Sequence, residues 1–341
     1  MKTLIQMLSR GKESRPQPLE DLLPQSKFGR RCSLLSIIPL FMLAVSGTLF
    51  VGTAASHPGV DPEIEEVTHE LEEEPNRVDL WIQRGRLYRS GGAFNESLKD
   101  FEQAKQLAPD KKELILERGL TLSAMGRDVD AEVEFGRFLE SESSSSGDLN
   151  RARVVALAER GHIRARTGRE ESAIADFTAA LEMRPAVGLY LARGKAQESL
   201  GDLDAAAAGY REGLAKIGNV ISLKKALIRV ETARNRYDEV LRLIDEELAR
   251  TSVKTPWHLH RAEILTLMGQ AQAARLARQQ ALEETNRVLG RRPTALNRVS
   301  RAKVYIAMGN VDAAKRDLQL AVQIAPHFAE AGELLRKLEG R

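Results

Sequence analysis

Histidines and carboxylates are the first side chains in this sequence to test for chemistry. His258 and His260 lie two positions apart, and on a helix that spacing points them to different sides, which disfavours a shared metal. The sequence contains no HExxH, no glycine-rich phosphate loop after a strand and no cluster of cysteine ligands. No nucleophile, base and orienting group come together in its pattern. We therefore predict that the protein is not an enzyme and that it holds no metal and no cofactor.

One charged pattern does recur along the chain. An arginine precedes a small residue in six places: Arg84, Arg118, Arg160, Arg193, Arg261 and Arg301. In four of these segments an acid follows sixteen positions after the arginine, at Asp100, Glu134, Asp176 and Asp317. Where one segment has leucine at the arginine position, Leu227, it also has leucine at the acid position, Leu243. This paired replacement favours a structural bridge between two helices. The competing interpretation is a ladder of arginines that binds an anionic ligand.

The elements that position these residues repeat about every 34 residues. A glycine or asparagine recurs at intervals of 34, 42, 33, 34, 34 and 40, at Gly92, Gly126, Gly168, Gly201, Asn235, Gly269 and Gly309. Each of them separates two amphipathic stretches. Glycine tolerates the positive φ that ends a helix sharply, and asparagine is the usual substitute. A period of this length with two helices is typical of stacked helix hairpins.

Small and bulky residues keep a fixed distance from each turn. Small residues recur seven positions before the turn residue, as at Gly85 and Gly161. Bulky apolar residues recur nine positions after it, as at Phe101 and Phe177. Small side chains let two helices approach closely, and we expect the bulky residue to wedge between neighbouring hairpins. Ile228 and Arg278 depart from these two patterns. Prolines 75, 109, 185 and 326 are expected to end the second helices.

The segment from Trp81 to Pro109 resembles a tetratricopeptide repeat. The residues that match that family's pattern are Trp81, Gly85, Tyr88, Gly92, Phe94, Phe101, Ala104 and Pro109, with Ser97 in place of its usual alanine. The resemblance covers seven copies and implies an all-α, right-handed solenoid of about seven antiparallel helix hairpins with capping helices. It further implies that the first helix of each pair lines a concave groove, which docks peptides or helices of other proteins and carries no chemistry.

The sequence divides into five segments. Residues 1–31 form a basic leader, 32–56 a signal peptide or a single membrane anchor, 57–77 an N-terminal capping helix, 78–326 the tetratricopeptide solenoid and 327–341 a C-terminal capping helix. Two insertions lengthen the period: eight residues around the serine run that ends at Gly147, expected to form a surface loop, and six near Val288, expected to lengthen a second helix.

The amino terminus indicates export. Residues 32–60 contain no Asp, Glu, Lys or Arg, with Arg30 and Arg31 before them and Asp61 after them. Basic residues before an apolar run place the amino end in the cytoplasm. Two outcomes remain open: cleavage after Ala55 or Ser56, or retention as an anchor. We thus expect a periplasmic or inner-membrane-anchored protein of the bacterial envelope, with its repeats outside the cytoplasm and membrane contact through this segment alone.

Charge is unevenly distributed over the repeats. Residues 57–150 carry 11 basic and 22 acidic side chains, and residues 151–341 carry 33 basic and 23 acidic ones. This asymmetry favours charged partners or head-to-tail self-association. Nucleic acid is not expected as a partner, because aromatic residues are few and the repeats are exported.

These patterns predict an adaptor that binds another protein, of acidic character, in the groove. The groove-facing positions lie one residue after the small site, at Arg86, Leu120, His162, Lys195, Arg229, Glu263 and Lys303. We expect Arg86, His162, Lys195, Arg229 and Lys303 to bind the partner. The alternative function is an accessory subunit that recognises an anionic ligand or a cell-wall polymer through the basic carboxyl half.

Overall fold

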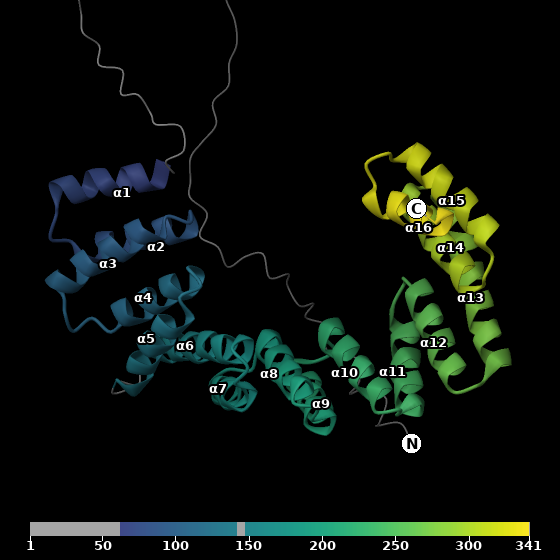
Figure 1. Cartoon of the computed structure of the whole chain (residues 1–341), viewed down its shortest axis with the longest axis horizontal. Helices are drawn as coiled ribbons and strands as arrows, with labels where there is room; N and C mark the ends of the chain where they lie inside the picture. The colour runs from purple at the N-terminus through teal and green to yellow at the C-terminus, as the bar shows by residue number, and fades with distance from the viewer. Residues whose placement is uncertain (1–61, 142–146, 341) are drawn as a thin grey trace, which may run out of the picture. The chain divides into compact units, whose positions relative to one another are not determined.

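The computed structural model describes residues 62–141 and 147–340, all within one compact unit, His57–Arg341. These residues form sixteen α-helices and no strand (Figure 1). The all-α prediction is therefore confirmed. The predicted leader, the segment 32–56 and the tip of the serine-rich loop lie outside the described residues.

Seven helix hairpins lie between two single helices. Helix α1 (Pro62–Glu73) comes first and α16 (Ala329–Glu339) comes last. The hairpins are α2 (Val78–Ser90) with α3 (Phe94–Leu107), α4 (Glu113–Ala124) with α5 (Asp128–Glu140), α6 (Gly147–Arg166) with α7 (Glu170–Met183), α8 (Val187–Ser199) with α9 (Leu203–Ile217), α10 (Ile221–Ala233) with α11 (Tyr237–Arg250), α12 (Thr255–Leu267) with α13 (Ala271–Arg291), and α14 (Ala295–Ala307) with α15 (Val311–Ile324). The predicted count of hairpins is confirmed.

The turn inside each hairpin lies where the repeat predicts it. All seven predicted turn residues have positive φ, from 58° at Asn235 to 80° at Gly92. In the first hairpin the N–H of Ala93 donates to the carbonyl of Tyr88 over 2.8 Å. That bond satisfies a carbonyl that the helix end leaves open, and it holds the short link in place.

A glycine and an aromatic ring bring the two helices of a hairpin together. A Cβ on Gly161 of α6 would lie 2.7 Å from Cε1 of Phe177 on α7, so only glycine leaves room for the ring. The same arrangement occurs at Gly85 with Phe101, at Gly119 with Phe135 and at Gly194 with Tyr210.

The position of these rings adds a contact within the hairpin to the expected contact between hairpins. Each ring packs first against the glycine of its own hairpin. It also reaches the next hairpin, since Phe135 shares a cluster with Ile163 of α6. The ring thus belongs to both interfaces. It can lie directly against the first helix because the glycine there has no side chain.

The two departures from the pattern have different consequences. Ile228 in α10 is buried, with 1% of its surface exposed, and so packs as a core residue. Arg278 in α13 occupies the ring position but is half-buried, and its Nη2 donates to Oγ1 of Thr266 over 2.8 Å. Helix α13 is 21 residues long, which confirms that the second insertion lengthens a second helix.

A buried ion pair joins α10 to α11. Nζ of Lys224 lies 2.6 Å from Oε1 of Glu247, and the two side chains are 4% and 7% exposed. Nδ2 of Asn219 donates to the same carboxylate oxygen over 3.2 Å. Burial alone would raise the pKa of the Glu247 carboxyl, but the hydrogen bonds from Lys224 and Asn219 hold that pKa below its ordinary value.

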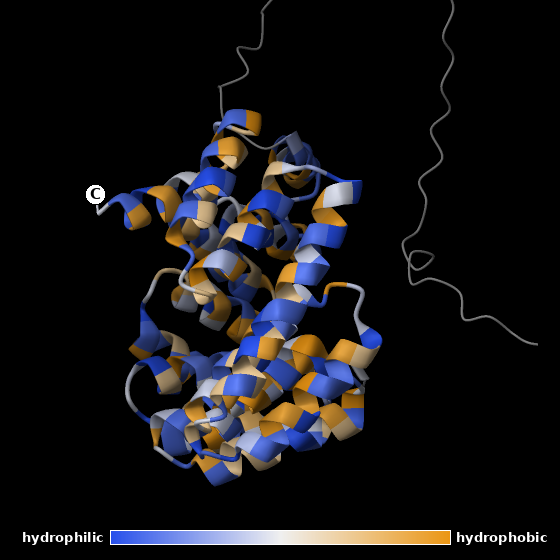
Figure 2. Cartoon of the chain, turned by 90° about the vertical axis from the view of Figure 1, so that its right-hand side faces the viewer, coloured by the Kyte–Doolittle hydropathy of each residue, from blue (hydrophilic) through white to orange (hydrophobic). Residues whose placement is uncertain are grey.

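Polar and apolar residues alternate along the helices (Figure 2). The apolar stripes, such as Ile64, Val67 and Leu71 of α1, face neighbouring helices. In the part of the chain that the structure describes, no helix has both the length and the apolar character to cross a membrane.

Replacing Phe177 with alanine tests the contact between glycine and ring. The ring is fully buried, so the change should lower the free energy of unfolding by roughly 3–5 kcal/mol. Denaturant titration of the full chain measures it. Gln103→Ala, at an exposed position of α3, is the control and should change stability by no more than about 0.5 kcal/mol. Equal effects of the two changes would contradict the packing described above.

The Lys224–Glu247 pair gives a second prediction. Glu247→Leu removes the nearer carboxylate from the buried Lys224 ammonium and leaves only that of Glu246, at 3.4 Å. The loss should destabilise the chain by up to about 3–5 kcal/mol. Adding Lys224→Met removes the stranded charge, so the double variant should recover most of that loss. Denaturant titrations of the single and double variants form the measurement. Additive losses would show that the two side chains act independently.

Candidate docking surface on the first helices

The recurring arginines and acids meet inside the hairpins. Nε and Nη2 of Arg84 donate to the two carboxylate oxygens of Asp100, each over 2.8 Å. Arg160 holds Asp176 in the same way over 3.0 and 2.6 Å, and Arg301 holds Asp317 over 2.7 and 2.8 Å. The three acids are almost fully buried. Such two-pronged bonds match the planar guanidinium to the carboxylate.

The other three arginines use different acids. Arg118 approaches Glu134 at 3.7 Å but donates its hydrogen bond to Glu102, over 2.8 Å. Arg193 and Arg261 have no acid at the position that the pattern predicts, but each still binds a carboxylate. Arg193 binds Glu212, and Arg261 binds Asp245. Every arginine of the row therefore holds a carboxylate of this chain. This geometry favours the structural interpretation over a ladder that binds ligand.

The five predicted binding residues have different surroundings. Arg86 lies 2.6 Å from the Glu117 carboxylate of α4, Arg229 pairs with Glu198 of α8, and Lys303 lies 2.5 Å from Glu330 of α16. His162 is exposed, with its ring 5.1 Å from that of Phe177. Lys195 is exposed and has no ion-pair partner among the described residues. Three of the five thus bind neighbouring helices of the chain itself.

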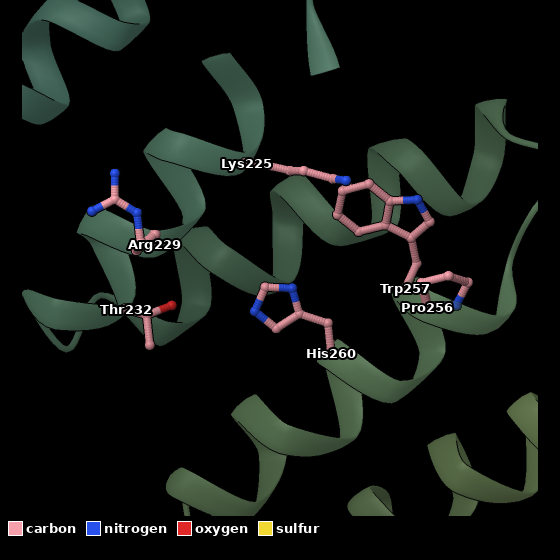
Figure 3. A pocket seen from close by; sticks show the side chains of 6 residues that line it. All are labelled: Lys225, Arg229, Thr232, Pro256, Trp257 and His260. Atoms are coloured by element: carbon pink, nitrogen blue, oxygen red, sulfur yellow. The ribbon is translucent and has the colours of Figure 1, made fainter. Parts of the chain in front are cut away.

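The structure shows a hollow on the first-helix face that the repeat pattern did not indicate. It has two adjoining parts that share Pro256 and His260, and we call it the α12 hollow. The first part, of about 420 Å³, lies between α10 and α12 (Figure 3); its walls are Lys225, Arg229, Thr232, Pro256, Trp257 and His260. The second part, of about 670 Å³, continues along α12 to Ala307 of α14 and includes Leu259, Glu263, Thr266, Leu267 and Arg278.

Charge within the first part of the hollow is positive. Its walls include Lys225 and Arg229 and contain no aspartate or glutamate. Burial lowers the pKa of the His260 imidazole, so this ring is neutral at neutral pH. Arg229 is neutralised by Glu198, whereas no ion pair engages Lys225 among the described residues. Lys225 is therefore the cation that remains available to a ligand at this end.

Two of the predicted residues belong to the groove-facing row and also line the hollow, namely Arg229 and Glu263. Lys225, Trp257 and His260 were not predicted from their positions. A signal for them did exist, because the hollow lies beside the ring position that Arg278 occupies.

The side chains of this surface can contact a partner. Within the ranges 62–141 and 147–340, no three histidine, cysteine, aspartate or glutamate side chains gather as a metal site would require. His258 and His260 differ in surroundings: His260 lines the hollow, whereas the Nδ1 of His258 is buried without a hydrogen-bond partner. Apolar walls with one available ammonium suit a partner's side chains.

Comparison with known proteins agrees with the repeat geometry. The tetratricopeptide repeat family model matches residues 78–111, 154–187 and 298–328. These matches cover the first hairpin, α7 with most of α6, and most of the last hairpin. No curated protein matches the chain.

Several solved structures are similar to the chain. A tetratricopeptide repeat protein from Parabacteroides merdae is 18% identical, with 77% of this chain and 99% of that chain covered and a TM-score of 0.45. PilW, described as a widely conserved type IV pilus biogenesis factor, is 15% identical, with 55% and 83% covered and a TM-score of 0.46. MamA is 20% identical, with 45% and 85% covered and a TM-score of 0.39.

Tetratricopeptide repeats generally mediate protein–protein interactions, and their fold is typically a non-enzymatic scaffold. Here the three family matches lie on hairpins that turn at a glycine of positive φ and are followed by a proline. The first two of these hairpins also have the glycine–aromatic contact. The chain contains tetratricopeptide repeats.

Proposed function

We propose that this protein is a non-catalytic adaptor of the bacterial cell envelope that docks a segment of another protein on its first-helix face. The observation that carries the proposal is the α12 hollow, which combines apolar walls with positive charge on the face that the family uses for docking. The tetratricopeptide repeats support protein partners in general.

Export is the part of this proposal that rests on sequence. The uncharged run 32–60 has arginines before it and acids after it, which favours a cytoplasmic amino end and repeats outside the inner membrane. The sole cysteine, Cys32, precedes the repeats. The repeats therefore need no disulfide in an oxidising compartment, because stacking of neighbouring hairpins supplies their core.

The alternative function, recognition of an anionic cell-wall polymer, has weaker support. Its basis is the excess of basic residues in positions 151–341. Many of those side chains hold carboxylates of the chain itself, as Arg160, Arg193, Arg229 and Arg301 do. An exposed charge that is already paired attracts a polymer less than its formal charge indicates.

Photo-crosslinking tests the docking face. Leu267, 54% exposed, lies in the α12 hollow, and Leu276, 61% exposed, lies outside it on α13. A photoreactive residue at position 267 of the full chain should capture an envelope protein, and the same residue at position 276 should not. Gel analysis before and after protease treatment identifies the captured species. Equal capture at both positions would contradict the proposal, and a protease-resistant glycan at position 267 would favour the polymer alternative.

Protease accessibility tests the location. When the full chain is produced in a bacterial host, its repeats should be digested by protease added to cells with a permeabilised outer membrane. The mass of the mature protein then distinguishes cleavage after Ala55 or Ser56 from an intact anchor. Repeats that are degraded only after the inner membrane is lysed would show that they are cytoplasmic.

A further inference from the structure

The α12 hollow permits a more specific statement about the partner, which rests on the proposed docking function. We propose that the hollow recognises a short extended protein segment in which a carboxylate side chain is next to a large apolar side chain. The carboxylate would contact Lys225, and the apolar side chain would lie against Pro256 and Trp257.

The apolar part of the site is built from α12. Pro256 and the Trp257 indole form its wall beside α10, and Leu259 and Leu267 continue it toward α14. Leu267 is 54% exposed, so this surface is not covered by another described helix. An apolar side chain placed here removes both surfaces from water, and full burial of a leucine-sized side chain is worth about 1.5–3 kcal/mol.

The charged part of the site is Lys225. This side chain projects from α10 toward the Trp257 ring of α12, while Arg229 lies farther along α10 (Figure 3). Arg229 is held by the Glu198 carboxylate of α8. Lys225 has no such carboxylate within the described residues. A carboxylate from a partner therefore supplies the charge that this end of the hollow lacks.

The hollow borders the hairpin whose ring position carries a charged residue. In four other hairpins an aromatic side chain fills the space beside the small residue of the first helix. Here the ring position carries Arg278, whose guanidinium turns to Thr266. Arg278 lines the second part of the hollow together with Leu259 and Ala307.

The dimensions suit a short segment. Pro256, His260, Glu263 and Leu267 line the hollow at successive turns of α12. At a rise of 1.5 Å per residue, the eleven-residue step from Pro256 to Leu267 spans about 16 Å. An extended chain advances about 3.3 Å per residue, so about five residues would cover the hollow. The occupant is therefore a short segment and not a folded domain.

Tryptophan fluorescence provides a direct test. The chain contains two tryptophans, Trp81 and Trp257, so Trp81→Phe in the full chain leaves Trp257 as the sole reporter in the hollow. The probes are blocked five-residue peptides with a glycine–serine background. One set carries aspartate or glutamate next to leucine, isoleucine or methionine, in both orders. The matched sets replace the acid with its amide or the apolar residue with serine.

We expect the acid–apolar peptides to change the Trp257 emission and to bind about tenfold more tightly than the peptides that lack the apolar side chain, which corresponds to about 1.4 kcal/mol. Lys225→Ala should weaken acid–apolar binding about two- to fivefold, as for an exposed ion pair, and should leave binding of the amide peptides unchanged. Lys105→Ala removes an exposed lysine from α3, outside the hollow, and should have no effect.

Three results would overturn the inference. One is equal binding of acid-only and acid–apolar peptides, which would indicate unspecific charge attraction. Another is an equal effect of Lys225→Ala and Lys105→Ala. The third is that inorganic phosphate or anionic lipid vesicles displace the peptides at the same site, which would assign the hollow to phosphate groups.

The outcome is separable from that of the proposed function. If position 267 captures an envelope protein and Lys225→Ala leaves both that capture and the peptide binding unchanged, the adaptor function stands and this inference fails. If acid–apolar peptides bind as expected and position 267 captures no protein, the recognition chemistry stands and the envelope adaptor fails.

Discussion

The structure depends on how closely the two helices of a hairpin approach each other. At Gly161 the first helix has no side chain, and the Phe177 ring of the second helix occupies the space that a Cβ would need. The ring is fully excluded from water and also reaches the next hairpin. Close approach then requires a short link, and a residue of positive φ such as Gly168 provides it. The turn, the hairpin and the stacking of hairpins therefore all depend on the close contact between this glycine and this ring.

That close approach also determines what the charged residues can do. Arg160 and Asp176 adjoin Gly161 and Phe177 in sequence, so the helix contact brings guanidinium and carboxylate together, at 2.6 Å. A charge that is buried in this way needs its partner, because a buried charge without one destabilises the folded state. Much of the formal charge of the chain is consequently part of the fold. Charges available for recognition are those that neighbouring helices leave unpaired, such as Lys225.

Function on this scaffold is expected where the repeat is imperfect. A regular hairpin fills its own interface, as Phe101 does against Gly85, and offers a partner mainly polar side chains. Arg278, at the ring position of its hairpin, lines the α12 hollow. Replacement of the Arg–Asp bridge by Leu227 and Leu243 in the preceding hairpin accompanies a buried Lys224–Glu247 pair instead. Repeats that depart from the pattern thus keep the stacking of their neighbours while presenting a different surface.

The sequence by itself determined the hairpins, their number and their turns, since the residues that set them are close in the chain and recur with a fixed period. It also indicated which arginines and acids come together within a hairpin. Contacts between hairpins required the tertiary structure. Arg86 with Glu117, and Arg229 with Glu198, lie 31 residues apart, and no periodic signal distinguishes such a paired arginine from a free one. Lys225 and Trp257 likewise share a hollow only because α10 and α12 stack, and this packing decides which side chains remain available to a partner.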